Sequence, residues 1–252
     1  LCSLALKAGK NAMLYFHNDI DVETKSNDSP VTIADREGEE IIIRGIKSHF
    51  SKIQIIGEES SENGLPDTIE DKFFLLDPLD GTKEFIKKNG EFTVNIALID
   101  GGKPIMGVVY APALSKSYVG VVGQGAWTET AEGVNSISAK PHQPGELWKV
   151  VGSRSHQSPE IQNLLAQLEG ETELVAMGSS LKLCLVAEGE APLYPRLGPT
   201  SEWDTGAAHA VALAAGADVT VLDAANPLNS DAEALTYNQK ESVLNPYFLV
   251  SA

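Results

Sequence analysis

Two carboxylates flank a proline and a leucine in FFLLDPLDGTKEF, the stretch that spans residues 73–85. The proline after Asp77 favours a β-turn that brings the Cα atoms of Asp77 and Asp80 within about 7 Å of each other. Two carboxylates held so closely repel each other, and a shared cation or proton relieves the repulsion. Mg²⁺ prefers oxygen ligands, so Asp77, Asp80 and the Leu79 carbonyl form a candidate metal site. The alternative is an acidic surface turn in which both side chains only cap the backbone.

The glycine and threonine that follow add a candidate site for an anion. Gly81 and Thr82 open a stretch of helical character, and the free N–H groups at the start of a helix attract phosphate. Carboxylates for cations and amides for a phosphate thus lie five residues apart. The stretch therefore predicts metal ions held against a phosphate group.

One turn cannot supply all the ligands of a site with two metal ions, so further carboxylates are required. Glu58 in IIGEES follows an expected strand, at an end where side chains of α/β folds converge. Asp204 in SEWDTGAAHAVALAAG enters a helix rich in Ala and Gly, and an acid buried there needs a partner such as a metal. Both acids have simpler explanations, since Glu58 also fits a solvated loop and Ser201 with Asp204 fits a capping box.

Asp35, in SPVTIAD, precedes a helix that we expect to begin near Arg36. The default role of an acid at such a position is to cap the helix N-terminus. Its functional alternative is to accept a hydrogen bond from the hydroxyl of Thr82 and so activate a water molecule. The residues alone leave both roles open.

Composition excludes some classes of protein. The 252 residues suit one large domain or two closely packed halves, with 42% apolar and 21% charged residues. A net charge of −16 argues against binding of a nucleic acid polymer, which needs a basic face. No apolar run approaches the roughly 18 residues of a membrane span.

The two cysteines, Cys2 and Cys184, lie in separate apolar segments and fit buried thiols rather than a disulfide. We therefore expect a cytoplasmic protein, with peripheral contact to the inner face of the membrane as a further possibility. The chain begins at Leu1 inside an expected helix, so we also expect a few residues to precede it.

The order of the expected elements changes half-way along the chain. Helices are expected over 1–18 and 36–50, short strands over 52–57 and 72–76, and then a three-stranded antiparallel meander within 92–123. From about residue 147 strands and helices alternate. We therefore expect a mixed α+β and α/β fold, with an N-terminal half (1–135) that carries the metal motifs and a C-terminal half (136–252) that carries the last ligand.

Three motifs in this order, GEES, DPLDGTKEF and WDTGAAHAVALAAG, resemble the inositol monophosphatase superfamily of Mg²⁺-dependent, lithium-sensitive phosphatases. The resemblance covers essentially the whole chain and implies a layered αβαβα sandwich of the sugar-phosphatase type. Several segments are most similar to the CysQ branch, the 3'(2'),5'-bisphosphate nucleotidases. They are DGTKEFIKKNGEFTVNIALI, VVGSRSH, GSSLKLCLVAEGEAPLYPRLGPTSEWDT and LNPYF.

The resemblance implies an enzyme of sulfur metabolism that removes the 3'-phosphate from adenosine 3',5'-bisphosphate (PAP) and yields AMP, with the sulfated form PAPS as a second substrate. Two or three Mg²⁺ ions would be its cofactors, and the protein would be a monomer or a homodimer. The alternative within the superfamily is a phosphatase of inositol phosphates or of fructose 1,6-bisphosphate. A cation- or nucleotide-binding protein without catalysis, and a purely structural acidic protein, are the alternatives from other classes.

The resemblance also assigns roles to residues. It implies the metal ligands Glu58, Asp77, Leu79 (through its carbonyl), Asp80 and Asp204. The implied catalytic residues are Asp35 and Thr82, which would orient and deprotonate the attacking water, together with Glu58. The implied substrate-binding residues are Asp80, Gly81, Thr82, His156, Ser179, Lys182, Arg196 and Asp204.

The nucleotide side of this assignment has simpler explanations. A serine and a lysine near a helix start are commonly a cap and a solvated side chain, and a single histidine is commonly structural. Arg196 is the strongest candidate, because the forked guanidinium suits phosphate. The chain also departs from the family pattern in the order of the small residues after Asp204 and in a long stretch, DAANPLNSDAEALTYNQKES, which leaves the last strand in question.

Overall fold

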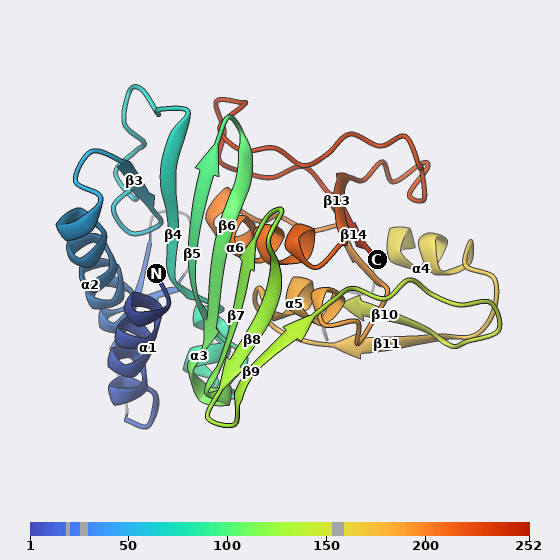
Figure 1. Cartoon of the computed structure of the whole chain (residues 1–252), viewed down its shortest axis with the longest axis horizontal. Coiled ribbons are helices and arrows are strands. Elements are labelled where there is room, and N and C mark those ends of the chain that lie inside the picture. Colours follow the sequence, from blue (N-terminus) through green and yellow to red (C-terminus); the bar gives the residue numbers. More distant parts are fainter. Residues whose placement is uncertain (19–20, 26–29, 153–158) are drawn as a thin grey trace.

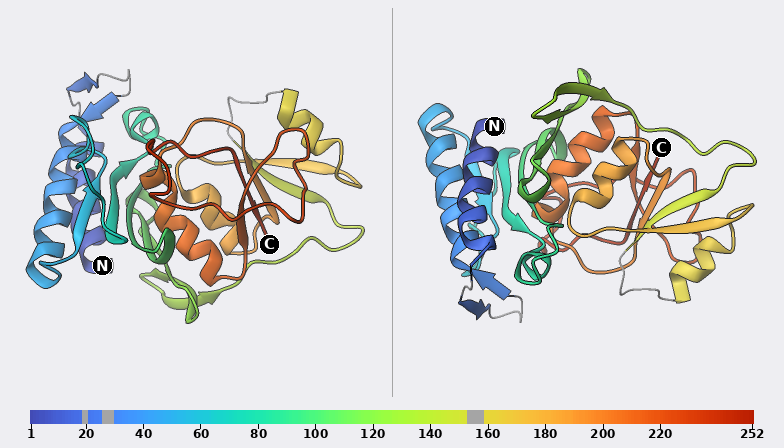
Figure 2. Two further views of the ribbon diagram at one scale, coloured as in Figure 1. Left: turned by 90° about the horizontal axis from the view of Figure 1, so that it is seen from above. Right: turned by 90° about the horizontal axis from the view of Figure 1, so that it is seen from below.

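A seven-stranded sheet and a five-stranded sheet form the frame of the protein, whose computed structural model describes residues 1–18, 21–25, 30–152 and 159–252. Helices cover both sheets and separate them, so that five layers follow one another (Figure 1). The predicted layered αβαβα sandwich is therefore confirmed. The same succession of layers is visible from above and from below in Figure 2.

The first sheet has the strand order β3-β4-β5-β6-β7-β8-β9. Its first pair, β3 and β4, is parallel, and all the other pairs are antiparallel. The predicted meander corresponds to β5, β6 and β7, and two further strands, β8 and β9, extend it beyond the prediction. The strands are β3 (Gln54–Gly57), β4 (Lys72–Asp80), β5 (Thr93–Asp100), β6 (Lys103–Ala111), β7 (Lys116–Val121), β8 (Gly125–Thr130) and β9 (Gly133–Ile137).

Two helices, α1 (Cys2–Phe16) and α2 (Ile33–His49), cover the outer face of this sheet. Their apolar residues recur at helical spacing, so that each helix presents one buried stripe to the strands. In α1 the stripe consists of small residues, which allow a close approach to the sheet, and in α2 it is built by isoleucines. The buried residues are Ala5, Ala8 and Ala12 of α1 and Ile42 and Ile46 of α2. A short hairpin, β1 (Val22–Thr24) with β2 (Pro30–Thr32), joins the two helices.

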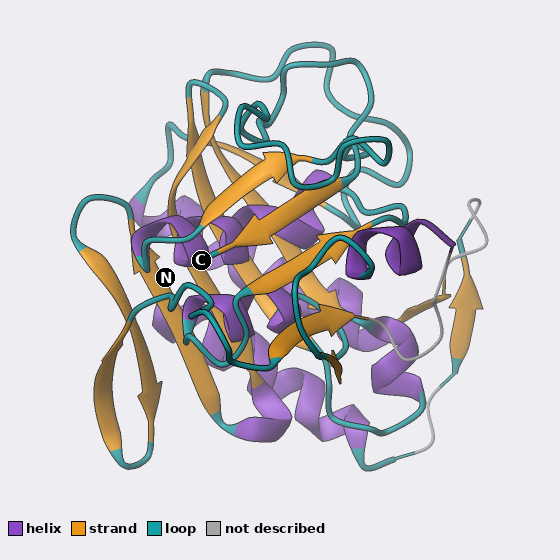
Figure 3. Ribbon diagram, turned by 90° about the vertical axis from the view of Figure 1, so that its right-hand side faces the viewer, coloured by secondary structure: helices purple, strands orange, loops and turns teal. Residues whose placement is uncertain are grey.

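The second sheet has the order β11-β10-β12-β14-β13 and mixes parallel with antiparallel pairs. Helices α5 and α6 lie between the two sheets, whereas α4 covers the outer face of the second (Figure 3). The elements are β10 (Trp148–Gly152), α4 (Pro159–Leu165), β11 (Thr172–Ala176), α5 (Leu181–Ala187), β12 (Leu193–Arg196), α6 (Glu202–Ala214), β13 (Asp218–Val221) and β14 (Phe248–Ser251).

The long stretch between β13 and β14 crosses back over α6. Tyr237 is fully buried, and its hydroxyl contacts both His209 (2.9 Å) and Thr205 (3.1 Å) of that helix. The side-chain amide of Asn245 donates to the carbonyl of Ser201 at 2.9 Å and to the Thr205 hydroxyl at 3.0 Å. This segment therefore fixes the N-terminal half of α6. The last strand, which the sequence left in question, is present as β14.

The predicted β-turn at 77–80 is wrong, because β4 continues to Asp80 with a bulge in place of the turn. Asp77 pairs with Asn95 and Asp80 with Thr93, so that three steps along β4 match two along β5. Pro78, which has no N–H to donate, falls within this bulge, where a strand tolerates proline. The sequence signal for a turn was overridden by the neighbouring strand, which pairs with the backbone on both sides of the proline.

Both cysteines are free thiols; Cys184 is buried and Cys2 is half-buried. Among the described residues no helix has both the length and the apolar character that crossing a membrane requires. The first sheet ends with β9 and the second begins with β10, but α6 packs against strands of the first. The division into halves at 135 and 136 stays a prediction.

Two glycines on neighbouring strands let α6 lie directly on the first sheet. Gly107 of β6 pairs with Gly120 of β7. A Cβ atom at Gly107 would lie 2.0 Å from the carbonyl oxygen of Ala207, and one at Gly120 would lie 2.5 Å from the Cα of Val211. Both contacts are with helix backbone, which cannot rotate out of the way as a side chain would. The position of α6 over the sheet therefore depends on these glycines.

We predict that Gly107→Ala lowers the free energy of unfolding by about 1–3 kcal/mol, the usual cost of forcing extra volume into a packed interior. Urea denaturation measures this change. Val122→Ala, an exposed substitution that follows β7, is the control and should change stability by no more than about 0.5 kcal/mol. Equal stabilities of Gly107→Ala and the unmodified protein would mean that α6 does not lie this close to β6.

Candidate active site

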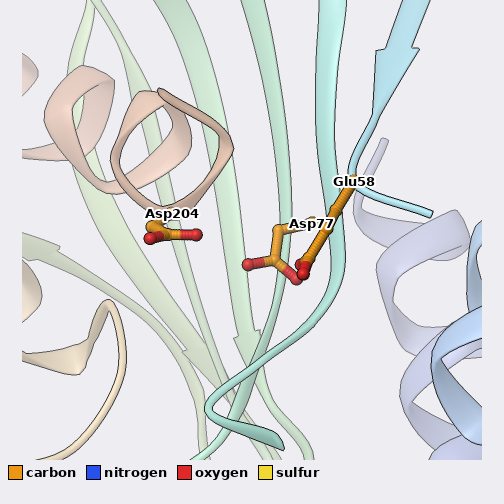
Figure 4. A group of neighbouring side chains, drawn as sticks. All are labelled: Glu58, Asp77 and Asp204. Carbon is orange, nitrogen blue, oxygen red and sulfur yellow. The ribbon is translucent and has the colours of Figure 1, made fainter. Parts of the chain in front are cut away.

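Three carboxylates from separate parts of the chain meet at one point between the first sheet and α6 (Figure 4). Glu58 follows the end of β3, Asp77 lies in β4, and Asp204 lies in the first turn of α6. One oxygen of each lies within 4.8 Å of the oxygens of the other two. The purely structural alternative, in which these acids are scattered in space, does not hold for these three.

The cluster is electrostatically strained. Asp77 is only 1% exposed, and burial first, then the charges of Glu58, Asp80 and Asp204, raise its pKa well above the ordinary value. Burial and the charge of Asp80 also raise the pKa of Asp204 to about 8. A divalent cation removes this repulsion and satisfies the hard oxygen donors. The three carboxylates therefore fit a metal ion, which they can hold between them.

Asp80 is oriented by another residue. Its Oδ2 accepts hydrogen bonds from the Ser180 backbone N–H at 2.5 Å and from the Ser180 hydroxyl at 2.6 Å. Its carboxylate is not one of the three that meet within 4.8 Å, although its charge raises the pKa values of both other aspartates. Its role as a metal ligand stays a prediction.

The backbone around Leu79 is tied to the neighbouring side chains. The N–H of Leu79 donates to Oδ1 of Asp77 at 3.0 Å, which fixes that carboxylate inside the bulge. The Leu79 carbonyl lies 3.3 Å from the Thr82 hydroxyl, within reach of a hydrogen bond. Whether this carbonyl also binds a metal stays a prediction.

Asp35 and Thr82 contact each other as expected for the predicted pair. The Thr82 hydroxyl lies 3.1 Å from Oδ1 of Asp35 and donates to it. Oδ2 of Asp35 accepts from the backbone N–H of Thr32 at 2.8 Å and from its hydroxyl at 2.6 Å. Thr32 is the N-cap and Asp35 the third residue of α2, so the prediction of Asp35 as N-cap and of a start near Arg36 is wrong. A capping box fixes the Asp35 carboxylate and leaves its second oxygen for Thr82.

Asp204 combines both roles that the sequence left open. Its Oδ2 accepts the backbone N–H of Ser201 at 2.8 Å, which is half of the capping box at the start of α6. Its carboxylate is at the same time a member of the cluster. The cap therefore sets the direction in which Asp204 enters the site.

Gly81 turns the chain from β4 into α3 (Thr82–Ile86). It adopts φ +92°, in the left-handed region that favours glycine. A Cβ atom there would also lie 3.0 Å from the carbonyl oxygen of Glu91. The turn places the Gly81 and Thr82 amides beside the carboxylates, as an anion site requires, and their role in binding phosphate stays a prediction.

A cavity of about 460 Å³ opens beside the cluster. Its lining includes six of the eight residues predicted to bind substrate: Asp80, Gly81, Ser179, Lys182, Arg196 and Asp204. Thr82 lies in the sequence between Gly81 and Lys83, which line the cavity, but is not itself part of the lining. His156 lies outside the described residues. Lys182 is buried, which lowers its pKa to about 8, although the charge of Asp80 acts in the opposite direction. The lining of the cavity thus contains the positive side chains of Lys182 and Arg196 together with the acids Asp80 and Asp204.

Sequence reasoning missed two residues that hold the predicted ligands. Lys25 is only 7% exposed, and its ammonium lies 2.8 Å from Glu58 and 2.6 Å from Glu59. Burial opposes its charge, but the two glutamates hold the pKa of Lys25 above its usual range. Ser180 joins Asp80 to the carbonyl of Asp204, 2.5 Å from its hydroxyl. In the sequence, Lys25 is a lysine in a polar loop and Ser180 is a serine next to Ser179, so neither carries a signal of its role.

The comparison with protein families agrees with this geometry. The model of the inositol monophosphatase family matches residues 1–247. This chain belongs to that family. Its members depend on metal ions, in keeping with the cluster of carboxylates.

Several relatives are similar to this chain over its whole length. The 3'(2'),5'-bisphosphate nucleotidase CysQ of Escherichia coli O6:H1 is 46% identical over 253 residues, which cover 100% of this chain and 98% of that protein. CysQ of Buchnera aphidicola is 40% identical, with coverage of 100% and 92%.

Solved structures show the same fold. The crystal structure of CysQ from Bacteroides thetaiotaomicron gives a TM-score of 0.79 at 38% identity and covers 99% of this chain and 94% of that one. The inositol monophosphatase of Thermotoga maritima gives 0.75 at 22% identity, with coverage of 99% and 89%. At that identity the likeness concerns the fold alone.

The raised pKa values predict how the metal-free protein responds to pH. A carboxyl with a raised pKa binds its proton more tightly in the folded state, so its stabilising effect is present at low pH and is lost as pH rises. For Asp204 this loss runs from about pH 4 to about pH 8. With a chelator present, we expect the free energy of unfolding to fall by at least about 1.4 kcal/mol across this range, the value of one pKa unit.

Asp204→Asn keeps the shape of the side chain and removes its charge. We expect this variant to lose the part of the pH dependence that Asp204 contributes and so to show a smaller slope, and saturating Mg²⁺ to flatten the profile of the unmodified protein. Urea titrations at several pH values provide both measurements. An identical slope in Asp204→Asn and the unmodified protein would assign the pH dependence to other groups.

Proposed function

We propose that this protein is a Mg²⁺-dependent 3'(2'),5'-bisphosphate nucleotidase that hydrolyses PAP to AMP and phosphate. The observation that carries the proposal is the juxtaposition of two features at one point. The cluster of Glu58, Asp77 and Asp204 can hold a metal, and the Asp35–Thr82 pair comes from α2 and from the start of α3, which directly follows β4. The relatives that are 45–46% identical over the full chain are 3'(2'),5'-bisphosphate nucleotidases, which supports the choice of substrate.

Glu58, Asp77 and Asp204 would hold the metal, with Asp80 and the Leu79 carbonyl as further ligands. The bound cations would supply positive charge to the phosphate oxygens and lower the pKa of water. Two or three Mg²⁺ ions are proposed, because one ion would leave part of the negative charge of four acids and a phosphate uncompensated.

Asp35 and Thr82 form the proposed general base. The Thr82 hydroxyl donates its hydrogen to Asp35, so its oxygen is directed to accept a hydrogen from the attacking water. Burial raises the pKa of Asp35, which strengthens it as a proton acceptor, although the hydrogen bonds from Thr32 act in the opposite direction. The water proton would pass through Thr82 to Asp35, while the Gly81 and Thr82 amides hold the phosphate in line.

The positive side of the cavity supports a nucleotide with two phosphates. Ser179, Lys182 and Arg196 are proposed to contact the sugar and the second phosphate, and His156, which lies outside the described residues, stays a proposed substrate-binding residue on the strength of the resemblance alone. The cytoplasmic location and a monomeric or dimeric state stay proposals, as does peripheral membrane contact. PAPS is proposed as a second substrate.

A phosphate-release panel tests the proposal directly. PAP, PAPS, inositol 1-phosphate and fructose 1,6-bisphosphate are each supplied with Mg²⁺, with and without Li⁺. We expect PAP to give the highest kcat/KM and Li⁺ to inhibit. A higher value with inositol 1-phosphate would instead favour a sugar phosphatase, and metal binding without phosphate release would favour a non-catalytic protein.

We predict that Asp35→Asn lowers kcat on PAP by about 10²–10⁴-fold, the usual contribution of a general base, with little change in KM. The amide keeps an oxygen for the capping box, so the fold should persist. Steady-state kinetics and a thermal melt test both points.

Glu37→Gln is the matched control, because Glu37 lies on the same helix and accepts from Asn11 and Tyr15 instead. It should leave kcat within about twofold. Near-normal kcat in Asp35→Asn would remove Asp35 from the mechanism.

A further inference from the structure

Lys83 lies where two cavities meet. The first is the cavity beside the carboxylates, and the second, of about 300 Å³, is lined mostly by apolar residues of β10, β12 and the turn after β12. Three residues line both cavities: Lys83, Tyr194 and Arg196. These three residues form the boundary between the cavities, and two of them are positively charged.

The guanidinium of Arg196 is fixed and has a donor to spare. Its Nη2 donates to the Pro199 carbonyl at 2.8 Å, which sets the plane of the group. Its Nε is buried and has no hydrogen-bond partner among the described residues. An unpaired buried N–H is costly, and an acceptor on a ligand would relieve that cost.

The ammonium of Lys83 is likewise free of a partner in the part of the chain that the structure describes. Other lysines near acids are engaged: Lys25 with Glu58 and Glu59, Lys116 with Glu188 and Lys240 with Glu202. Lys83 is exposed, at the first turn of α3, directly after Gly81 and Thr82. Lys83 therefore lies next to the Gly81–Thr82 turn, which is proposed to hold the scissile phosphate, and also at the boundary between the two cavities.

The residues that line both cavities include two cations and no acid. Glu84 and Glu91 line the first cavity but not the second, so the boundary itself carries the positive side chains of Lys83 and Arg196. The protein as a whole has a net charge of −16 and repels a polyanion. A doubly phosphorylated nucleotide therefore needs local cations to bind.

We propose that Lys83 and Arg196 together bind the non-scissile phosphate of a nucleotide bisphosphate, and that Lys83 sets the preference for bisphosphates over monophosphates. The inference rests on the proposed function, because it assumes that the scissile phosphate lies beside Asp80 and Asp204. The two cations come from separate elements, Lys83 from α3 and Arg196 from the end of β12, and both line the two cavities. Arg196 offers a rigid planar donor, and Lys83 a mobile point charge that follows the phosphate.

The test compares PAP with 3'-AMP, which has the same scissile phosphate and lacks the second one. In Lys83→Met, which keeps the aliphatic stem, we expect kcat/KM for PAP to fall about tenfold, as the loss of one charge-assisted hydrogen bond predicts. The value for 3'-AMP should change less than twofold. Lys83→Arg should restore most of the difference.

Lys87→Met is the matched control, at the C-cap of α3, because Lys87 lines the first cavity and not the boundary. This substitution removes the same charge, so it measures the general loss of attraction, which acts more strongly on the doubly phosphorylated PAP. We expect Lys83→Met to lower the ratio of the kcat/KM values for PAP and 3'-AMP clearly more than Lys87→Met does. An equal effect of Lys83→Met on PAP and 3'-AMP would overturn the inference.

Different outcomes would contradict the proposed function and the role of Lys83. An unmodified protein that releases phosphate from neither nucleotide would contradict the proposed function, and the inference with it. An unmodified protein that prefers PAP, together with a Lys83→Met variant of unchanged preference, would contradict the inference alone.

Discussion

The mutual repulsion of buried carboxylates is the constraint on which the site depends. Asp77 and Asp204 are buried beside Glu58 and Asp80. Burial and the charges of these two neighbours raise the pKa values of both buried aspartates. A protein gains no stability from such a group unless a cation or a proton compensates it. The surrounding structure must therefore hold the acids together against a force that separates them, and this requirement explains the features around them.

Each acid is fixed by at least one bond to backbone or to a buried neighbour. The bulge in β4 lets the Leu79 N–H hold Asp77, and the caps of α2 and α6 hold Asp35 and Asp204. The Ser180 backbone N–H donates to Asp80, and the Ser180 hydroxyl lies 2.5 Å from the backbone carbonyl of Asp204, so that Ser180 links the first sheet to α6. Because these bonds use only one oxygen of Asp35 and one of Asp204, a second oxygen of each stays available to the site.

The alternation of apolar residues was sufficient to predict the meander. The layers and the meeting of Glu58, Asp77 and Asp204 followed from the family resemblance that the three motifs carry. The sequence was insufficient where a contact distant along the chain decides the local structure. A proline between two acids favours a turn until β5 pairs on both sides of it. The roles of Lys25 and Ser180 depend on partners 33 and 100 residues away, which no local spacing encodes.

The strand order of the second sheet bears on how the site is assembled. β14 is the last strand along the chain, yet it lies between β12 and β13. The segment just before it carries Tyr237 and Asn245, which fix the helix that holds Asp204. During synthesis the first sheet is complete in sequence long before residues 237–251 emerge, so the contacts that fix the start of α6 form last. A nascent chain would thus hold Asp204 less firmly beside Glu58 and Asp77 until this last segment has packed.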